Sequence, residues 1–224
     1  MVTPAIIFIG SSKIFGDESA FLIQEYWKGE SGETAMPRLA AAERLHLFRD
    51  WGKEVAKLHG IATAAERDWH TIASERLAVL TERNLTAGVI SKKELLQAES
   101  KIRHLLDRFG DSVKLAPIHG DLYPPNILIN QGRFAGLLDF DHAKLFDPCF
   151  DFVKLRMWTF QEEGDEEAFM KGYREYAGNA NYFDEHFAAC FGLELLSGFP
   201  FWRKQKNDRL AQEYQEAFKE WLSY

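Results

Sequence analysis

The sequence contains little cysteine and no long hydrophobic segment. Only Cys149 and Cys190 occur among its 224 residues, and neither lies in a spacing that metal sites use. A disulfide framework is therefore not expected, and a reducing, cytoplasmic location is the default for such a chain. No apolar run approaches the length of a transmembrane helix, and the N-terminus lacks the basic segment and cleavage pattern of a secretory signal. We predict a cytoplasmic protein without a membrane partner.

Positive charge is also limited. The chain carries 27 Lys and Arg residues against 34 Asp and Glu residues, which gives a formal net charge of −7 at pH 7. Because nucleic-acid binding requires a basic surface, we predict no nucleic-acid partner. The acidic balance is compatible with a cationic small-molecule partner, and it is also ordinary for a solvated protein surface.

What the sequence does contain is a run of polar residues set among apolar ones in its second half. The run reads His-Gly-Asp-Leu-Tyr-Pro-Pro-Asn over residues 119–126 and Asp-Phe-Asp over residues 139–141. It supplies Asp121, Asn126 and Asp139. Phosphoryl transfer from a nucleotide needs one carboxylate that orients and deprotonates the attacking hydroxyl, and an amide oxygen and a second carboxylate that hold the metal ions. The protein-kinase signature has these groups in the same order, as H-R-D-L-x-x-x-N followed by D-F-G.

Two short apolar runs between these residues predict a β-hairpin. Residues 127–130 and 134–138 are separated by Gln-Gly-Arg, which is typical of a turn. Asn126 lies at the entrance of this hairpin and Asp139 at its exit, so a tight hairpin would bring the two side chains together. Two consecutive prolines before Asn126 stiffen the loop because each fixes φ and lacks an N–H.

The two motifs resemble those of the aminoglycoside phosphotransferase and choline kinase superfamily, which shares the protein-kinase fold and has H-G-D in place of H-R-D. Residues 146–152, Phe-Asp-Pro-Cys-Phe-Asp-Phe, are similar to the family's G-D-P-x-x-D-L-A. The resemblance implies that Asp121 is the catalytic base and that Asn126 and Asp139 bind Mg²⁺ and the phosphates of ATP or GTP. It also implies that Asp151 begins a helix and supports the backbone of the catalytic loop, which is a structural role.

Two further residues of the motifs are secondary candidates for the site. His119 opens the H-G-D turn, and Asp141 stands where the protein-kinase signature has Gly. Asp141 either adds negative charge near the metal ions or faces solvent. An ordinary turn is the alternative interpretation of a single tripeptide, but several elements in matching order favour the family.

The N-terminal residues predict a second hairpin. Apolar runs at residues 5–9 and 19–26 flank a turn-forming Gly-Asp-Glu. By the resemblance this hairpin corresponds to the last strands of the N-terminal lobe, and residues 24–29 correspond to the hinge between the lobes. The resemblance then implies that the C=O of Glu25 and the N–H of Trp27 bind the adenine edge. A plain edge hairpin is the alternative.

Most of the remaining sequence predicts helices. Residues 30–37 are polar and broken by Gly and Pro, which indicates a connection. Helices are expected at residues 48–58, 63–83, 91–109, 152–160, 165–177, 182–197 and 210–222. The predicted fold class is α+β and protein-kinase-like. It comprises a remnant β-hairpin of the small lobe at residues 1–29 and a mainly helical C-terminal lobe, with the catalytic β-hairpin, at residues 30–224.

The part of the kinase signature that covers the phosphates has no counterpart in this sequence. Only residues 1–4 precede the first hairpin, so the Gly-rich loop, the strand Lys and its helix Glu are missing. We therefore expect this form to bind ATP weakly and to turn over little, and an upstream extension to restore both. The edge of the N-terminal hairpin would then be exposed and would need to be covered. Formation of a homodimer through this edge is one way to cover it.

Two functions are consistent with these features. The first is ATP- and Mg²⁺-dependent transfer of phosphate to a hydroxyl of an aminoglycoside-, choline- or sugar-like small molecule. The second is a truncated, non-catalytic kinase-like domain that binds a ligand. For the first, the acceptor is expected over Asp121. The acidic run at residues 162–167 either meets an amine of the acceptor or forms a solvated face, as charge runs usually do. Candidate lining residues of the acceptor pocket are the aromatic side chains Trp158, Phe160, Phe199 and Trp202.

Overall fold

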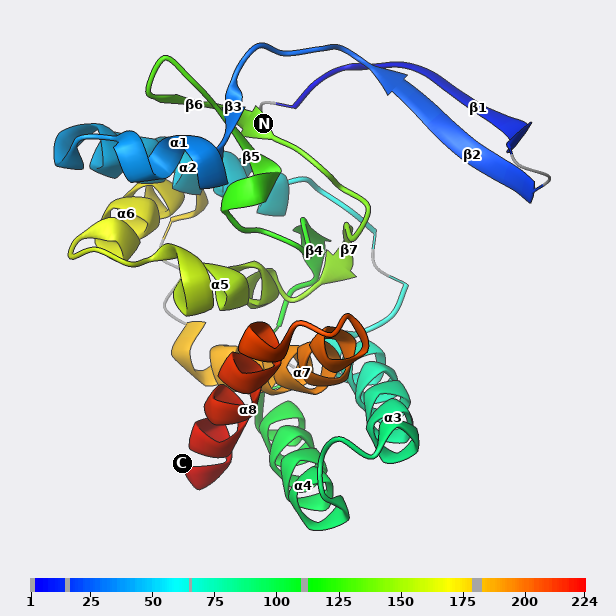
Figure 1. Ribbon diagram of the computed structural model, residues 1–224. Helices are drawn as coiled ribbons and strands as arrows, with labels where there is room; N and C mark the ends of the chain where they lie inside the picture. Colours follow the sequence, from blue (N-terminus) through cyan, green and yellow to red (C-terminus); the bar gives the residue numbers. More distant parts are fainter. Residues whose placement is uncertain (1–2, 15–16, 65, 110–112, 179–182) are drawn as a thin grey trace.

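The computed structural model describes residues 3–14, 17–64, 66–109, 113–178 and 183–224. In this part of the chain the strands form small antiparallel sheets, and helices make up most of the structure (Figure 1). The fold class is therefore α+β, as predicted. The paired strands are β1 (Ile6–Ile14) with β2 (Asp17–Gln24), β3 (Glu30–Ser31) with β5 (Ile127–Asn130) and then β6 (Arg133–Leu137), and β4 (Ala116–Ile118) with β7 (Lys144–Phe146).

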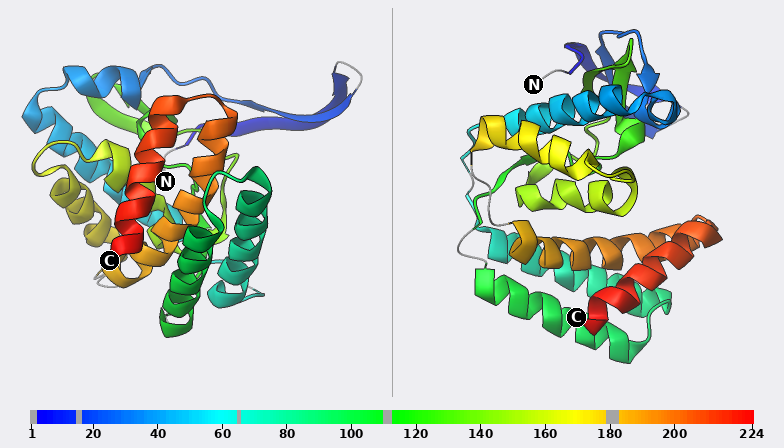
Figure 2. Two further views of the ribbon diagram at one scale, coloured as in Figure 1. Left: turned by 60° about the horizontal axis from the view of Figure 1, so that its bottom comes forward. Right: turned by 90° about the vertical axis from the view of Figure 1, so that its left-hand side faces the viewer.

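The long helices form two groups, with β4 and β7 between them (Figures 1 and 2). One group contains α2 (Ala41–His59) and α6 (Asp165–Ala177). The other contains α3 (Trp69–Ala87), α4 (Lys92–Phe109), α7 (Phe183–Lys204) and α8 (Asp208–Ser223). The short helical segments are α1 (Gly32–Ala35), α5 (Asp151–Lys154), the 3₁₀ turns η1 (Met36–Arg38), η3 (Pro124–Asn126) and η4 (Pro148–Phe150), and the π-helical η5 (Leu155–Thr159).

Helices α2 and α6 approach closely because a glycine lies at the contact on each. A Cβ on Gly52 would lie 2.0 Å from the backbone oxygen of Phe169, and a Cβ on Gly172 would lie 1.9 Å from that of Arg49. Only glycine allows the two backbones to come this close. The contact fixes the position of α2, whose last residue, His59, reaches the site described below.

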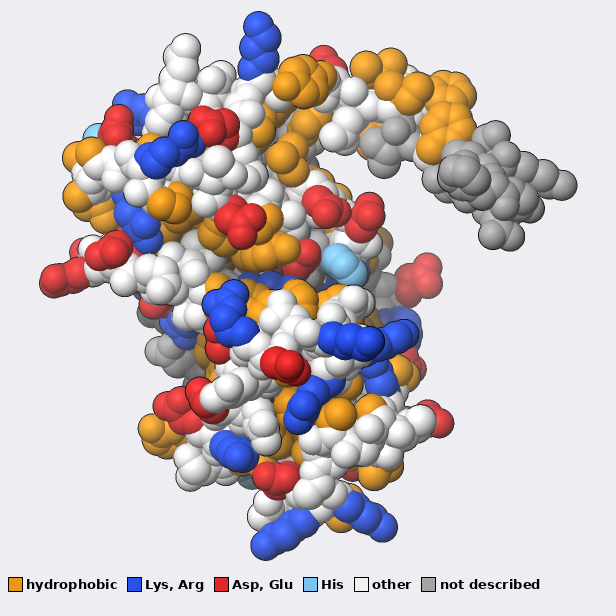
Figure 3. Space-filling view, viewed as in Figure 1, with side chains coloured by type: hydrophobic (Ala, Val, Ile, Leu, Met, Phe, Trp, Pro, Cys, Tyr) orange, Lys and Arg blue, Asp and Glu red, His pale blue; other side chains and the backbone are white. Residues whose placement is uncertain are grey.

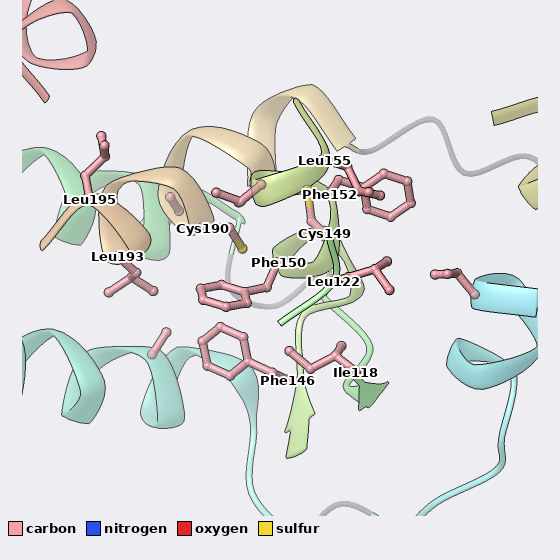
Figure 4. Packing of buried hydrophobic residues seen from close by; sticks show 14 of the residues in the cluster. Ile118, Leu122, Phe146, Cys149, Phe150, Phe152, Leu155, Cys190, Leu193 and Leu195 are labelled. Atoms are coloured by element: carbon pink, nitrogen blue, oxygen red, sulfur yellow. The ribbon is translucent and has the colours of Figure 1, made fainter. Parts of the chain in front are cut away.

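A hydrophobic core lies beneath the His-Gly-Asp segment. Ile118 and Leu122, on either side of that turn, belong to the same core as Phe146, Phe150 and Leu193 (Figure 4). The rings of Phe146 and Phe150 meet edge to face, with centroids 5.4 Å apart. Both cysteines are buried there as free thiols. Because burial of each large apolar side chain contributes about 1.5–3 kcal/mol, the motif is carried on a firmly packed base.

The helix predicted over residues 63–83 begins later than expected. It starts at Trp69, because the carboxylate of Asp68 caps it by accepting the backbone N–H of Thr71 at 2.7 Å. The described residues of the Ala-rich segment before Asp68 are not helical. An N-terminal cap therefore outweighs the helix propensity of the alanines.

Four other segments also differ from prediction. Helix α2 begins at Ala41, seven residues before the predicted start at residue 48. Residues 30–37 are more than a connection, because β3 pairs with β5 and is followed by α1 and η1. The helix predicted over residues 152–160 is divided into α5 and the π-helical η5. Helix α7 runs past its predicted end at residue 197 to Lys204 and contains Pro200.

The β1–β2 hairpin stands away from the helical body (Figures 1 and 2). Its exposed apolar side chains are Ile6, Ile7, Phe8, Ile9, Phe21 and Ile23. An isolated two-stranded hairpin is marginally stable in water, so this apolar surface favours a covering partner. Cover by further strands or by a second copy of the chain stays a prediction.

Candidate active site

The His-Gly-Asp turn is positioned by the short β4–β7 pair. Strand β4 ends at Ile118, opposite Lys144 of β7, and the chain turns immediately afterwards. Gly120 makes the turn with a φ of 78°, where glycine is favoured. A Cβ at this position would lie 2.3 Å from the backbone oxygen of His142. The fold therefore requires glycine at the centre of the motif.

Asp151 lies behind this turn and is surrounded by donors. Its carboxylate accepts the backbone N–H groups of His119 at 2.8 Å and of Gly120 at 2.7 Å. The ring Nε2 of His59 lies 3.0 Å from the same carboxylate, and the hydroxyl of Tyr173 lies 2.9 Å from the other ring nitrogen. Burial by itself raises the pKa of Asp151, but the hydrogen bond and charge of His59 hold that pKa below its ordinary value. The carboxylate thus ties the turn to the end of α2.

The side chains of Asp121 and Asn126 meet in front of the turn. The amide nitrogen of Asn126 donates to the backbone oxygen of Asp121 at 2.8 Å and to its carboxylate at 3.1 Å. The ammonium of Lys154, at the end of α5, donates to the other carboxylate oxygen of Asp121. No described residue donates to the amide oxygen of Asn126, which leaves that oxygen for another ligand.

Asp139 follows β6 and is linked to Asn126 through the backbone. The N–H of Leu138 donates to the C=O of Asn126 at 2.9 Å, so Asp139 is next to a residue that is bonded to Asn126. Asp139 has a φ of 60°, a left-handed conformation that is uncommon outside glycine and is found at functional sites. Its side chain is exposed, as is that of Asp141, whose N–H lies 3.4 Å from an Asp139 carboxylate oxygen.

His119 joins the two motifs. Its ring Nε2 lies 2.8 Å from the C=O of Leu138, and its ring packs on Phe140 with centroids 4.7 Å apart. The side chain is fully buried. The imidazole therefore connects the two loops from inside the protein and is not open to solvent.

The oxygens of Asn126 and Asp139 fit a magnesium site. Mg²⁺ prefers oxygen ligands and usually binds one or two protein groups together with water and substrate phosphates. The amide oxygen of Asn126 and the exposed carboxylate of Asp139 are ligands of this kind on neighbouring segments. Among the described residues, no group of three His, Cys, Asp or Glu side chains could hold a metal ion by itself. A metal ion here would therefore depend on the phosphates of a nucleotide.

The residues predicted to bind adenine lie at the base of the β1–β2 hairpin. The carboxylate of Glu25 accepts the indole N–H of Trp27 and the backbone N–H of Ala5, each at 3.2 Å. Within the described ranges no residue hydrogen-bonds to the C=O of Glu25 or to the backbone N–H of Trp27. Both backbone groups are thus available to a ligand, and their role in adenine binding stays a prediction.

A cavity of about 380 Å³ opens beside Asp121. Trp158 and Trp202 line it, as expected for an acceptor pocket. The other two aromatic residues predicted to line it are instead part of the packing: Phe199 is buried, and Phe160 packs against the core. Helical aromatic residues are frequently core residues, and sequence alone does not separate the two roles.

The acidic run at residues 162–167 is partly buried. Asp165 is fully buried and accepts two hydrogen bonds from the guanidinium of Arg44 in α2, at 2.9 and 2.6 Å. The same carboxylate accepts the backbone N–H groups of Gln161 and Glu162. The prediction that this run meets an amine is therefore wrong for Asp165, whose charge is used inside the fold.

Several charged residues at the cavity were missed from the sequence. Lys154 lies one helical turn after Asp151, and that spacing was a usable signal because residues three apart share a helix face. Arg76 and Lys144 also line the cavity, from α3 and β7. No local pattern links them, because the tertiary fold alone brings these two elements together.

The model of the phosphotransferase enzyme family matches residues 4–189. The chain belongs to this family. It is 52% identical over 62 residues to the uncharacterized protein YcbJ of Bacillus subtilis (strain 168), which is 27% of this chain and 19% of that protein. It is 29% identical over 119 residues to a homoserine kinase of Phenylobacterium zucineum (strain HLK1), which is 52% of this chain and 37% of that enzyme. The matches thus cover well under two thirds of either relative.

Solved structures of aminoglycoside phosphotransferases share the fold. A thermostable mutant of APH(4)-Ia matches 100% of this chain and 78% of its own, with a TM-score of 0.71 and 12% identity. The GDP and kanamycin complex of APH(2")-IIia matches 98% of this chain and 75% of its own, with a TM-score of 0.65 and 15% identity. The fold is therefore the protein-kinase-like fold that was predicted. None of the described helices is both long enough and apolar enough to cross a membrane.

Proposed function

We propose that the protein transfers the γ-phosphoryl group of ATP or GTP to a hydroxyl of a small molecule, with Mg²⁺ as cofactor. The observation that carries this proposal is the linkage of three groups beside a cavity. Asn126 contacts Asp121 through its side chain and the residue before Asp139 through its backbone, and Asp121 lines the cavity. Such an arrangement supports phosphoryl transfer, which depends on positioning and on neutralising charge.

Each group has a role in this proposal. Asp121 orients the acceptor hydroxyl and takes its proton. Lys154, which is bonded to Asp121, holds that carboxylate in place and adds positive charge beside the transferred group. Asn126 and Asp139 would hold Mg²⁺, which neutralises phosphate charge when it is bound with the nucleotide. Asp151 holds the loop and does not touch the substrate.

The relatives support a hydroxyl compound as acceptor. One curated relative is a homoserine kinase. Among the similar structures, one is a complex of APH(4)-Ia with ADP and hygromycin B, and another contains GDP and kanamycin.

A phosphate-transfer assay tests the proposal. The protein is incubated with Mg²⁺ and γ-labelled ATP or GTP in the presence of kanamycin, hygromycin B, choline or L-homoserine. We expect slow transfer, because this form is expected to turn over little, and we expect it to depend on Mg²⁺. It should be lost in Asp121→Asn and retained in Asp107→Asn, the same change at an exposed carboxylate on α4. Ligand binding without transfer to any hydroxyl would instead favour a non-catalytic kinase-like domain.

A further inference from the structure

The cavity beside Asp121 is basic, although the chain as a whole is acidic. The formal net charge of the chain is −7. The cavity, in contrast, is lined by four cations, Arg76, Arg83, Lys144 and Lys154, and by two carboxylates, Asp121 and Glu194. Figure 3 shows Lys and Arg side chains gathered on the lower half of the molecule, beneath the hollow under the β1–β2 hairpin. The local charge is therefore opposite in sign to that of the whole protein.

The two carboxylates already have partners. Asp121 is paired with Lys154, and Glu194 accepts the hydroxyl hydrogen of Tyr214 at 2.7 Å. Neither Arg76 nor Lys144 has a described carboxylate within ion-pair distance. Within the part of the chain that the structure describes, these two cations thus form no ion pair, and the nearby charge of Glu194 acts on both of them without a direct contact.

Arg76 lies in the cavity wall and has a hydrogen-bond donor that no described residue accepts. Its guanidinium lies over the ring of Phe150, 5.4 Å from the centroid. Its Nε is buried and has no hydrogen-bond partner among the described residues. Burial lowers the pKa of Arg76, and the charge of Glu194 opposes that shift. The residue is half-buried, and a buried donor that lacks a partner is costly. The planar fork of the guanidinium is suited to carboxylate or phosphate.

Lys144 lies over the same ring. Its ammonium is 4.9 Å from the centroid of Phe150. Burial, followed by the positive charge of Arg76, lowers the pKa of Lys144 to about 8. Two cations that repel each other over one aromatic ring would be stabilised by an anion between or beside them, because the anion would restore the ordinary pKa of the ammonium.

We propose that the acceptor carries an anionic group, a carboxylate or a phosphate, which Arg76 binds with the help of Lys144. This inference rests on the function proposed above, because it names the class of compound whose hydroxyl meets Asp121. The cavity of about 380 Å³ suits a small metabolite. A polycationic acceptor would meet like charge in this cavity.

A matched series of probes on one carbon skeleton tests the inference. The probes are glycerol, D-glycerate, glycerol 3-phosphate and 3-amino-1,2-propanediol, which differ in carrying a neutral, carboxylate, phosphate or ammonium group. Binding to the full chain is measured by calorimetry in EDTA without nucleotide, so that a metal–phosphate site does not contribute. We expect one or both anions to bind and the neutral and cationic probes not to bind. The preferred anion distinguishes carboxylate from phosphate.

Variants identify the residues that bind the anion. Arg76→Gln should weaken anion binding about tenfold or more, because it removes a charge-assisted contact, and Lys144→Met should weaken it to a smaller extent. Arg103→Gln is the matched control, since Arg103 is paired with Glu99 on the surface of α4. Absence of anion binding, tighter binding of the ammonium probe, or unchanged binding in Arg76→Gln would overturn the inference.

The same probes separate this inference from the proposed function. The transfer assay with Mg²⁺ and ATP is repeated with these probes. If anions bind in a way that depends on Arg76, but no probe and no acceptor of the earlier panel is phosphorylated, the proposed function is contradicted and the anion site is supported. Phosphorylation of a neutral or cationic acceptor at the same rate in Arg76→Gln would support the function and contradict the anion site.

Discussion

Two groups of charged residues flank the His-Gly-Asp turn, and the protein uses them in opposite ways. Behind the turn, the buried carboxylate of Asp151 is matched by two backbone N–H groups and by His59. In front of it, the cavity holds more cations than carboxylates, and Arg76 retains a buried nitrogen without a partner. A group whose partners are complete stabilises the fold, whereas one with unmatched charge is prepared for a ligand.

The largest effect is expected from Asp121→Asn, in front of the turn. The substitution keeps the shape of the side chain but removes the proton acceptor, so kcat should fall by about 10²–10⁴-fold. The midpoint of thermal unfolding should change little because Asp121 is partly exposed. Steady-state kinetics and thermal melts on the same preparation check both statements. Wild-type kcat in the variant would mean that another group is the base.

Behind the turn, Asp151→Ala should act on stability. It leaves the N–H groups of His119 and Gly120 without their acceptor, so the free energy of unfolding should fall by about 1–3 kcal/mol. Urea unfolding measures the loss, with Asp107→Ala as a surface control that should stay within about 0.5 kcal/mol of wild type. An Asp151→Ala protein as stable as the control would show that the hydrogen bonds from the turn to Asp151 do not stabilise the fold.

The lowered pKa of Asp151 makes its contribution to stability depend on pH. The pKa is lower in the folded protein than in the unfolded chain, where it is about 3.9. The stabilisation by Asp151 is therefore complete above the unfolded-state value and is lost as the pH falls through the folded-state value. The stability difference between wild type and Asp151→Asn should be constant near neutral pH and shrink in acid. A difference that grows in acid would contradict the sign of the shift.

The smallest effect is expected from Lys144→Met, in front of the turn. This substitution should raise the free energy of unfolding, whereas Asp151→Ala should lower it. The pKa of Lys144 is about 8 in the folded protein, below the unfolded value of about 10.4. Below pH 8 the folded state thus carries a charge that it disfavours, so the variant should be more stable at pH 7 by about 1–2 kcal/mol, reduced for the remaining solvent contact.

The pH dependence provides the check on Lys144. Between about pH 8 and 10.4 the unfolded chain binds more protons than the folded one, so wild-type stability should rise with pH in this window and approach that of Lys144→Met. Urea unfolding of both proteins at pH 7 and pH 10 measures the convergence. A variant that is less stable than wild type at pH 7 would show that the ammonium has a partner.

The difference between the two groups also explains what the sequence could predict. The H-G-D turn, the hairpin after Asn126 and the bounds of α6 depend on local chemistry, and the structure has them where the sequence indicated. The helix expected over residues 91–109 likewise begins where the sequence indicated, with the N–H of Glu94 donating to the hydroxyl of Ser91 at 3.2 Å. The lobe boundary between residues 29 and 30 stays a prediction.

The charge of the cavity could not be predicted, because it is a property of the tertiary fold. Arg76 and Lys144 come from a helix and a strand that are distant in the chain, and only the packing over Phe150 brings them together. The same applies to Asp165, which looked like part of a solvated acidic run until Arg44 was seen to pair with it. Pairing across the fold therefore decides which charges remain available to a ligand.

The most direct test of a nucleotide and metal site at Asn126 and Asp139 is a calorimetric titration with a non-hydrolysable ATP analogue. We predict binding in Mg²⁺ that disappears in EDTA and in Asp139→Ala, because Asn126 and Asp139 would hold the metal ion only together with the phosphates of the nucleotide. Asp107→Ala should bind as wild type does. Equal affinity in Mg²⁺ and EDTA, or wild-type affinity in Asp139→Ala, would contradict the account.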